Sequence, residues 1–417
     1  MTEPEKPKEV TRRSYLKYVG GAVVAAAVAA AGYGLYSTSQ PQTPTTQTIT
    51  QTATEIQTAT TKAGYFWGDT PFEMVEEWYW TLNRAALAYA SVTGDRLMTI
   101  DPHMHLESQA KDVAYMTELG IDGLMGCPID PEGAIKTFED VKAKGIPIAT
   151  YDGSANTSAI DISIRVDARR LGKQLGEAFA KKMQDAGAKL EGDLFMIYHG
   201  EQNPFQTDRM LGMLDGLQQY SGLNILKYAC ESSQEKAKTA VFEAAQSQGK
   251  PTMVMATNMT QFIGAVEGLQ SANMAVPRGQ DGHVWVAGVD CGQEILKFIK
   301  EGLVDVGIDQ PNLWYGTLAM RFLRMIKEKG ASALPEFGQT VISDPALAEG
   351  TQTDGTYNVV IPDFEYKGVR PFQYRIFAPC PCIEEKGHRW LQVNSFIVDE
   401  TNADTAPIWT NVAKAWF

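Results

Sequence analysis

The feature that most constrains the fold is a regular alternation of short apolar runs and helical patterns through residues 64–330. A first series of runs reads "GYFW", "RLMTI", "DGLMGC", "IPIATY" and "ISIRV", and a second reads "DLFMIYH", "NILKYAC", "TMVMAT", "VWVAGVD" and "LVDVGID". Segments with apolar residues at helical spacing separate most of these runs. This alternation predicts an α/β fold in which helices cover parallel sheets. Ten such strands form either one barrel or two open sheets.

Length and charge bound the answer further. The chain has 417 residues, of which 44% are hydrophobic, and this is enough for two or three domains with their own cores. Its formal net charge of -13 offers no basic surface that could neutralise phosphates. We therefore expect no nucleic-acid partner.

Residues 1–36 read as a targeting segment. Arg12 and Arg13 stand in "TRRSYLK", directly before the apolar run "YVGGAVVAAAVAAAGYGLY", and the pattern resembles a twin-arginine export signal. The alternative is a plain basic flank that orients a membrane segment. Both interpretations send the following residues across a membrane. Because the run is about long enough to span a bilayer, we expect a membrane anchor, although cleavage near "AAAG" is also open.

Residues 37–63 are dominated by Thr and Gln and carry almost no charge. Such a segment has little to bury and cannot offset the entropy lost on ordering, so it is expected to stay extended. It is either an O-glycosylated stalk, as in archaeal surface receptors, or a plain linker. In both cases it spaces a folded body away from a membrane.

One short stretch, "IDPHMHLES", hints at an enzyme. His103 and His105 follow an apolar run with one residue between them, so at a strand end both imidazoles would point toward one metal ion. Amidohydrolase barrels open with a motif of this look. The chain has only five His, however, and a binuclear hydrolase would need most of them. The His pair is therefore interpreted as solvent-exposed or bonded to its local surroundings, and a metal-dependent hydrolase is the alternative.

Several longer stretches resemble the ribose-binding-protein-like family of type I periplasmic solute-binding proteins. They are "SQAKDVAYMTELGIDGLMGCPIDPEGAIKTFEDVKAKGIPIATYDG", "RVDARRLGKQLGEAFA", "RMLGMLDGL", "VAGVD" and "VGIDQP". Their order and spacing, rather than any one of them, carry the resemblance. It covers residues 64–330 and implies two doubly wound parallel-sheet lobes, joined by three hinge crossings, that close on a ligand.

The resemblance also implies domain boundaries. The expected parts are an N-terminal lobe of residues 64–166 and 311–331, a C-terminal lobe of residues 167–310, and an extension of residues 332–417. The hinge crossings would lie near residues 166–167, near residues 309–310 and just after Gly330. The extension exceeds the family's usual tail, and "LQVNSFIVDETNAD" within it resembles the family's closing strand.

Ligand contacts in this family come from positions that seven residues of this chain match. They are Asp152, Arg209, Asn258, Asp290 and Gln310, with Phe72 and Trp67 as aromatic walls. Carboxylates would accept hydrogen bonds from sugar hydroxyls, the Arg fork would donate to oxygens, and amides would do both. Each residue also has a purely structural alternative, such as an Asx turn at Asp152, a helix N-cap at Asn258 or core packing for the aromatics.

Three departures from the family pattern leave the ligand open. The chain has Cys127 where the family often has Asn, Gly153 where it often has Arg, and Glu73 where a second Phe often stands. The expected ligand is a monosaccharide or a related polyol. In the extension, Cys380 and Cys382 lie near His388, and a small metal site, a disulfide to another Cys and free thiols all stay open.

These patterns together predict an extracytoplasmic substrate-binding subunit of an ABC importer, tethered to the cell membrane. We expect it to be no enzyme and to need no cofactor. Its expected partners are a carbohydrate ligand, the transporter's permease subunits and the membrane. The alternatives are a sugar-sensing receptor without a transport role and the hydrolase that would use His103 and His105.

Overall fold

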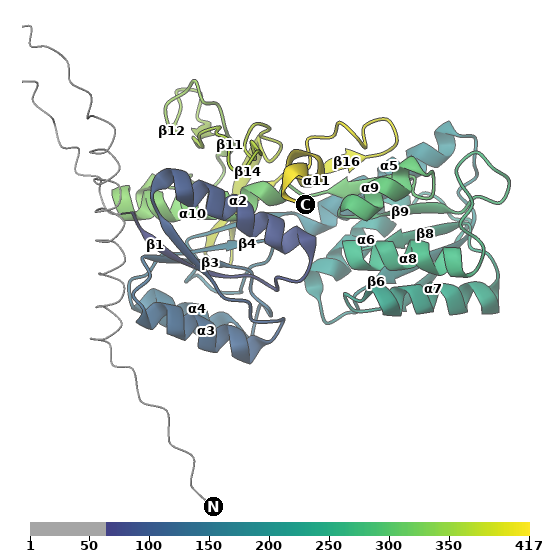
Figure 1. Ribbon diagram of the computed structural model, residues 1–417, viewed down its shortest axis with the longest axis horizontal. Coiled ribbons are helices and arrows are strands. Elements are labelled where there is room, and N and C mark those ends of the chain that lie inside the picture. Colours follow the sequence, from purple (N-terminus) through teal and green to yellow (C-terminus); the bar gives the residue numbers. More distant parts are fainter. Residues whose placement is uncertain (1–63) are drawn as a thin grey trace, which may run out of the picture. The chain divides into compact units, whose positions relative to one another are not determined.

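The computed structural model describes residues 64–417, and the expected export signal and stalk lie outside this range. Within it, the chain forms a ten-stranded and a six-stranded sheet, each covered by helices (Figure 1). The α/β class and the two doubly wound lobes predicted from the sequence are thereby confirmed. None of the helices in these residues combines the length and apolarity needed to span a bilayer.

The first lobe is built on five parallel strands of the ten-stranded sheet, in the order β2-β1-β3-β4-β5. These strands are β1 (Phe66–Thr70), β2 (Arg96–Thr99), β3 (Gly123–Gly126), β4 (Ile148–Tyr151) and β5 (Ile162–Val166). Two pairs of helices cover the two faces (Figure 1). The pairs are α2 (Glu77–Thr93) with α10 (Asn312–Lys329), and α3 (Leu106–Glu118) with α4 (Ile135–Ala143).

The second lobe is built on five parallel strands of the six-stranded sheet, in the order β10-β9-β8-β6-β7. These strands are β6 (Gly192–Tyr198), β7 (Leu223–Ala229), β8 (Met253–Ala256), β9 (Trp285–Val289) and β10 (Val306–Asp309). The helices are α5 (Ala168–Asp185), α6 (Pro204–Leu217), α7 (Gln234–Gln248), α8 (Met259–Ser271) and α9 (Gln293–Lys300).

Helices α5 and α6 approach each other so closely that only glycine fits between them. A Cβ at Gly172 would lie 2.0 Å from the backbone oxygen of Arg209, and one at Gly212 would lie 2.1 Å from that of Arg169. Such close packing holds α6 in one position on the lobe. It therefore also fixes the place of Arg209, which α6 carries.

The residues after α10 widen the first sheet and then return to the second. Their elements are η1 (Ala331–Ala333), β11 (Thr340–Ile342), β12 (Gly350–Thr351), β13 (Tyr357–Asn358), β14 (Cys380–Glu385), β15 (His388–Val393), β16 (Phe396–Val398), α11 (Trp409–Val412) and η2 (Lys414–Trp416). Strand β15 pairs in parallel with β5, and β14 pairs antiparallel with β15. Strand β16 pairs antiparallel with β10 in the other lobe.

This pairing moves one hinge crossing from its predicted place. The chain passes between the sheets after β5, after β10 and again at residues 394–395, between β15 and β16. The third passage was predicted just after Gly330. That prediction is wrong because the chain after Gly330 first adds β11–β15 to the first lobe's sheet.

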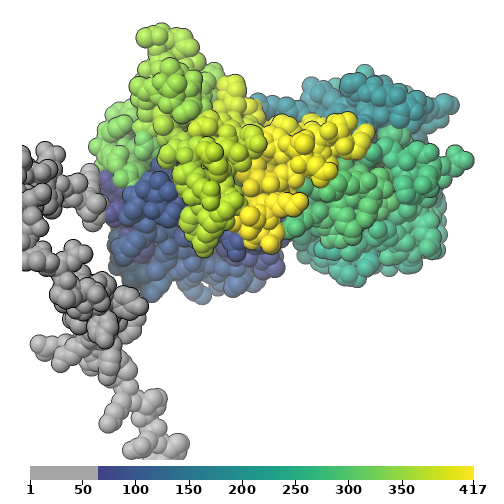
Figure 2. Space-filling view, turned by 45° about the horizontal axis from the view of Figure 1, so that its top comes forward, coloured from purple at the N-terminus to yellow at the C-terminus, as the bar shows by residue number. Residues whose placement is uncertain are grey.

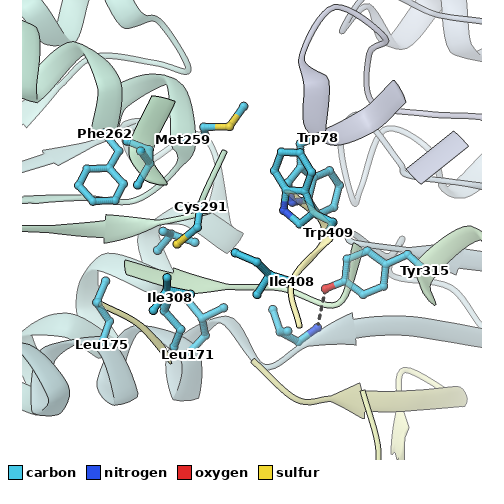
Figure 3. Packing of buried hydrophobic residues seen from close by; sticks show 14 of the residues in the cluster. Trp78, Leu171, Leu175, Met259, Phe262, Cys291, Ile308, Tyr315, Ile408 and Trp409 are labelled. Carbon is cyan, nitrogen blue, oxygen red and sulfur yellow. Dashed lines mark hydrogen bonds between the residues drawn. The ribbon is translucent and has the colours of Figure 1, made fainter. Parts of the chain in front are cut away.

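A continuous apolar core runs through both lobes, and a smaller one lies under α3 and α4. Figure 3 shows part of the larger core, with Leu171 and Ile308 on one side and Trp78 and Trp409 on the other. There Val166 N–H donates a hydrogen bond of 3.4 Å to the Tyr315 hydroxyl, which links β5 to α10 (Figure 3).

The five cysteines within the described residues are buried free thiols, at positions 127, 230, 291, 380 and 382. Cys380 and Cys382 belong to β14, where they face the core. The disulfide considered from the sequence is therefore not formed. His388 is buried as well and instead contacts the Ser154 hydroxyl at 3.1 Å and the Thr157 carbonyl oxygen at 3.1 Å.

Candidate ligand-binding site

The carboxyl ends of strands from both lobes meet around one cavity of about 300 Å³. Open parallel sheets bind ligands at this edge, where the strand ends leave a crevice. The first lobe contributes the segments that follow β1, β2, β3 and β4, and the second contributes those that follow β6, β7, β8 and β9. Gln310, after β10, completes the lining at a hinge crossing. The volume suits a small polar molecule.

Six of the seven residues predicted to bind ligand line this cavity. They are Phe72, Asp152, Arg209, Asn258, Asp290 and Gln310. They come from both lobes and from one hinge crossing, although up to 238 positions separate Phe72 from Gln310 in the sequence.

Trp67 is the exception, and its prediction as a wall of the site is wrong. Its ring is fully buried within the first lobe, where its Nε1 donates a hydrogen bond of 3.0 Å to Asp95 Oδ2 and its ring packs on Tyr65. It sits near the start of β1, and only the residues beyond the end of that strand reach the cavity. Trp67 is a core residue.

Asp290 is held in place by a chain of hydrogen bonds from the hinge. Gln310 Nε2 donates to Asp290 Oδ1 at 2.7 Å, and the Tyr315 hydroxyl donates to Gln310 Oε1 at 3.0 Å. The backbone of Asp290 has a φ of 71°, a left-handed conformation that Asp adopts more readily than most residues. This conformation turns the side chain at the end of β9 into the cavity.

Asp152 occupies the matching position on the first lobe. It follows β4, has a φ of 60°, and accepts a hydrogen bond of 2.8 Å from the Tyr79 hydroxyl. Two carboxylates with left-handed backbones therefore line the cavity from opposite lobes. Such strained conformations cluster at binding sites, where the surrounding structure has to hold them.

Arg209 lies between the two aspartates. Its Nη2 is 3.9 Å from Asp152 Oδ1, its Nη1 is 3.8 Å from Asp290 Oδ2, and Nη1 also donates to the Thr257 carbonyl oxygen at 3.1 Å. Its side chain is almost fully buried, and its Nε has no hydrogen-bond partner within the described residues. Because Arg209 lines the cavity, its guanidinium is suited to donate to a ligand oxygen.

Asn258 serves both as a helix cap and as part of the lining. Its Oδ1 accepts from Gln261 N–H at 3.0 Å, which caps α8, and its Nδ2 donates to Ser232 Oγ at 2.9 Å. The two roles considered from the sequence coexist in one residue. Gln206 Nε2 donates to the same serine at 3.0 Å and thereby extends the polar wall of the second lobe.

Aromatic side chains provide the apolar part of the wall. Phe72 stacks on Tyr79 with ring centroids 6.1 Å apart and an interplanar angle of 22°. Phe205, from the other lobe, also lines the cavity. Flat rings of this kind cover the C–H faces of a sugar ring, while the polar groups address its hydroxyls.

Burial raises the pKa values of the carboxyl groups in the cavity. Burial raises the pKa of Asp290 to about 6, although Arg209 and the hydrogen bond from Gln310 act in the opposite direction. Burial also raises the pKa of Asp152, again against the effect of Arg209. The pKa of His199 is lowered by burial, so this lining residue is neutral at pH 7.

Other lining residues were not predicted from the sequence. They include Glu73, Glu76, Tyr79, Cys127, Phe205, Gln206 and Ser232. Glu73 and Cys127 had been noticed only as departures from a family pattern. The signal for Glu73 and Glu76 is the acidic stretch "FEMVEE", but acids at a helix start are typical for reasons unrelated to ligands.

The His pair does not form a metal centre. His103 is exposed and contacts Asp101 through its Nδ1 at 3.0 Å, and His105 is an exposed residue that precedes α3. Neither lines the cavity. The hydrolase alternative thus has no site here.

Two α/β lobes joined by three crossings, with a polar cavity between them, define a ligand-binding protein that clasps its ligand in a cleft. A family model described as a periplasmic binding protein domain matches residues 70–331. The match covers more than half of the chain, and the chain belongs to this family. Its members bind substrates and are not enzymes.

Individual relatives are distant. The ribose import binding protein of Bacillus subtilis (strain 168) is 23% identical over 230 residues, which are 55% of this chain and 71% of the relative. A solved galactofuranose binding protein has a TM-score of 0.59 and 19% identity, with 65% of this chain and 90% of that chain covered. A carbohydrate transporter solute binding protein from Agrobacterium radiobacter, in complex with D-arabinose, has a TM-score of 0.62 and 14% identity, with coverage of 84% and 99%. At these identities the structural likeness establishes the fold.

Proposed function

We propose that this chain is the exported, membrane-tethered substrate-binding subunit of an ABC importer, and that it binds a monosaccharide or a related polyol between its lobes. The observation that carries the proposal is the lining of the cavity. Asp152 from one lobe and Arg209 with Asp290 from the other face the same space. The names of the relatives above, which refer to ribose, galactofuranose and arabinose, support a carbohydrate ligand.

Each polar group has a role that fits a ring of hydroxyls. In Asp152 and in Asp290, one carboxylate oxygen accepts a hydrogen bond from the protein. The second oxygen of each lies 3.9 Å and 3.8 Å, respectively, from an Arg209 nitrogen and accepts no hydrogen bond among the described residues, so it is available to a ligand hydroxyl. Arg209 donates to a ring or hydroxyl oxygen, and Asn258 both donates and accepts. Because these groups belong to different lobes, a ligand that contacts all of them stabilises the closed arrangement.

A screen of pentoses, hexoses, polyols and inositols by thermal shift tests the proposal. A ligand that binds only the native state raises its stability by about 2.7 kcal/mol at a concentration of 100 times Kd. We expect at least one of these compounds to raise the melting midpoint. Arg209→Ala should abolish that rise, whereas Lys181→Ala, on the exposed face of α5, should preserve it. No rise with any carbohydrate would contradict the proposal.

A further inference from the structure

The cavity holds more negative than positive groups. Its lining includes four carboxyl groups, from Glu73, Glu76, Asp152 and Asp290, and a single guanidinium, from Arg209. A neutral sugar would leave this imbalance in place after the lobes close and water is excluded. Like charges in a closed, poorly hydrated site repel one another, so a ligand that brings a positive charge would relieve the imbalance.

Three of the four carboxylates have donors within the protein. Glu73 accepts hydrogen bonds from the backbone N–H groups of Val75 and Glu76 at the start of α2. Asp152 accepts from Tyr79, and Asp290 accepts from Gln310. The hydrogen bonds that these three carboxyl groups accept from the protein therefore account for their placement in the cavity without a ligand.

The Glu76 carboxylate has no such explanation. Glu76 stands at the N-cap position of α2, yet its side chain makes no capping hydrogen bond. Among residues 64–417 it forms no ion pair and accepts no hydrogen bond, although it lines the cavity and is only partly exposed. When this carboxyl group ionises, it lacks the cation that would offset its loss of hydration.

Arg209 independently shows that the cavity is built for a ligand. It is 7% exposed, it lines the same cavity, and its buried Nε has no hydrogen-bond partner among the described residues. Among the described residues, no group of three or more His, Cys, Asp or Glu side chains is arranged to hold a metal ion. The missing cation is therefore better supplied by an organic ammonium than by a metal.

We propose that the ligand is a carbohydrate with a protonated amino group, such as an amino hexose, and that Glu76 binds the ammonium while Arg209 and the two aspartates bind hydroxyls. This inference rests on the proposed function and narrows its substrate class. The electrostatics of the empty cavity agree with it. Burial, followed by the charges of Glu73, Asp290 and Asp152, raises the pKa of Glu76 to about 8.

Calorimetry on the full chain with matched ligand pairs tests the inference. The pairs are D-glucosamine with D-glucose, D-galactosamine with D-galactose, and D-mannosamine with D-mannose. A charged hydrogen bond predicts that the preferred amino hexose binds about tenfold or more tightly than its neutral parent. Glu76→Gln should remove this preference, and Glu118→Gln, which removes an exposed charge from the same lobe, should not.

A second readout separates charge recognition from a loss of structure. At pH 7 the empty site holds a proton on Glu76, and an incoming ammonium lowers the pKa of that carboxyl group. Titrations in buffers of different ionisation enthalpy should therefore detect proton release in the parent and its loss in Glu76→Gln. A melting midpoint close to that of the parent would show that the variant is folded.

Three results would overturn the inference. Tighter binding of the neutral hexoses would show that charge is not recognised, and the proposed function would stand. A preference for amino hexoses that survives Glu76→Gln would refute the role of this carboxylate. If none of the amino hexoses binds while a neutral sugar of the broader screen does, the inference fails alone; if no carbohydrate binds, the proposed function fails with it.

Discussion

At the scale of single residues, Asp290 is expected both to bind the ligand and to change its protonation state near neutral pH. Its backbone φ of 71° favours Asp or Asn over Ala, so Asp290→Asn is the variant that keeps the local conformation. Asn retains one acceptor and loses the charge. Because hydrogen bonds to charged groups contribute about 1.5–3 kcal/mol each, we expect ligand affinity to fall roughly tenfold to a hundredfold. Calorimetry measures the change, with the exposed Asp185→Asn as the control.

The raised pKa of Asp290 gives this prediction a pH dependence. The carboxyl group takes up a proton as pH falls through about 6, and a protonated carboxyl group is a poorer acceptor for ligand hydroxyls. Affinity of the parent should therefore decrease between pH 7 and pH 5. The decrease should be smaller in Asp290→Asn, and an unchanged pH profile would mean that Asp290 does not accept from the ligand.

The ionisation of Asp309 should affect the stability of the protein rather than ligand binding. It is fully buried, its Oδ1 accepts from Trp409 Nε1 at 3.1 Å, and its Oδ2 has no partner among the described residues. Burial, followed by the charge of Asp290, raises its pKa to about 8. The folded state therefore holds a proton that the unfolded state releases above its ordinary pKa, so the free energy of unfolding falls as pH rises from about 4 to about 8.

Asp309→Asn should remove this decrease in the free energy of unfolding with rising pH. The amide resembles the protonated acid in shape and keeps an acceptor for Trp409, so we expect little change near pH 4 and a gain on the order of a few kcal/mol near pH 8. Urea unfolding at both pH values measures the difference between variant and parent. Equal stability of the two proteins at pH 8 would show that Asp309 ionises normally in the fold.

Single site residues could be predicted from the sequence where they directly follow a strand. Asp152, Asn258 and Asp290 each follow a strand, and a polar residue there is visible in the sequence. Trp67 was misassigned because burial inside a lobe depends on packing that the sequence does not display. Glu76 was missed because its significance depends on residues from the opposite lobe, which the sequence places far away.

At the scale of elements, a contact between α2 and α9 joins the two lobes beside the cleft. Gly292, the N-cap residue of α9, has no side chain to cap the helix. Glu77 of α2 supplies that function from the other lobe, since its Oε1 accepts from Gln293 N–H at 3.0 Å and its Oε2 accepts from Gln293 Nε2 at 3.3 Å. This contact exists only while the lobes are together.

Glu77→Gln should therefore favour lobe opening. Caps and charges at helix N-termini contribute about 0.5–2 kcal/mol, so the ligand dissociation rate should rise by a factor of roughly two to thirty. Stopped-flow displacement measures this rate. Glu301→Gln, which removes an exposed acid from the opposite end of α9, should leave the rate unchanged. If ligand dissociates faster from the control variant, or no faster from Glu77→Gln than from the parent, the contact between Glu77 and Gln293 does not hold the lobes together.

All ten strands expected through residue 310 are present, because each is a short apolar run between helical patterns. The extension was less predictable. Strands β11, β12 and β13 have two or three residues each, too few for a recognisable period. Strand β15 was expected only as part of a closing strand, since its pairing with β5 joins residues more than 200 positions apart.

At the scale of the whole molecule, the C-terminal segment connects the two lobes. Figure 2 shows the last residues, in yellow, over the boundary between the purple-to-blue and the teal-to-green parts of the chain. Trp409 donates to Asp309 of the second lobe, and its ring lies 5.9 Å from that of Phe417. The Phe417 ring in turn lies 5.0 Å from that of Trp80 on α2 of the first lobe.

The last prediction concerns cooperativity between the lobes. Trp409 is 1% exposed and belongs to the apolar core that runs through both lobes, so Trp409→Ala should lower the free energy of unfolding by about 3–5 kcal/mol. Tyr374→Ala, at a half-exposed aromatic residue of the extension, should cost far less. If one core stabilises the body, hydrogen exchange should accelerate to a similar degree in β1–β5 and in β6–β10 of the Trp409 variant, and melting should stay a single transition. Faster exchange confined to β6–β10 would instead mean that each lobe unfolds independently and that the C-terminal segment stabilises only the second lobe.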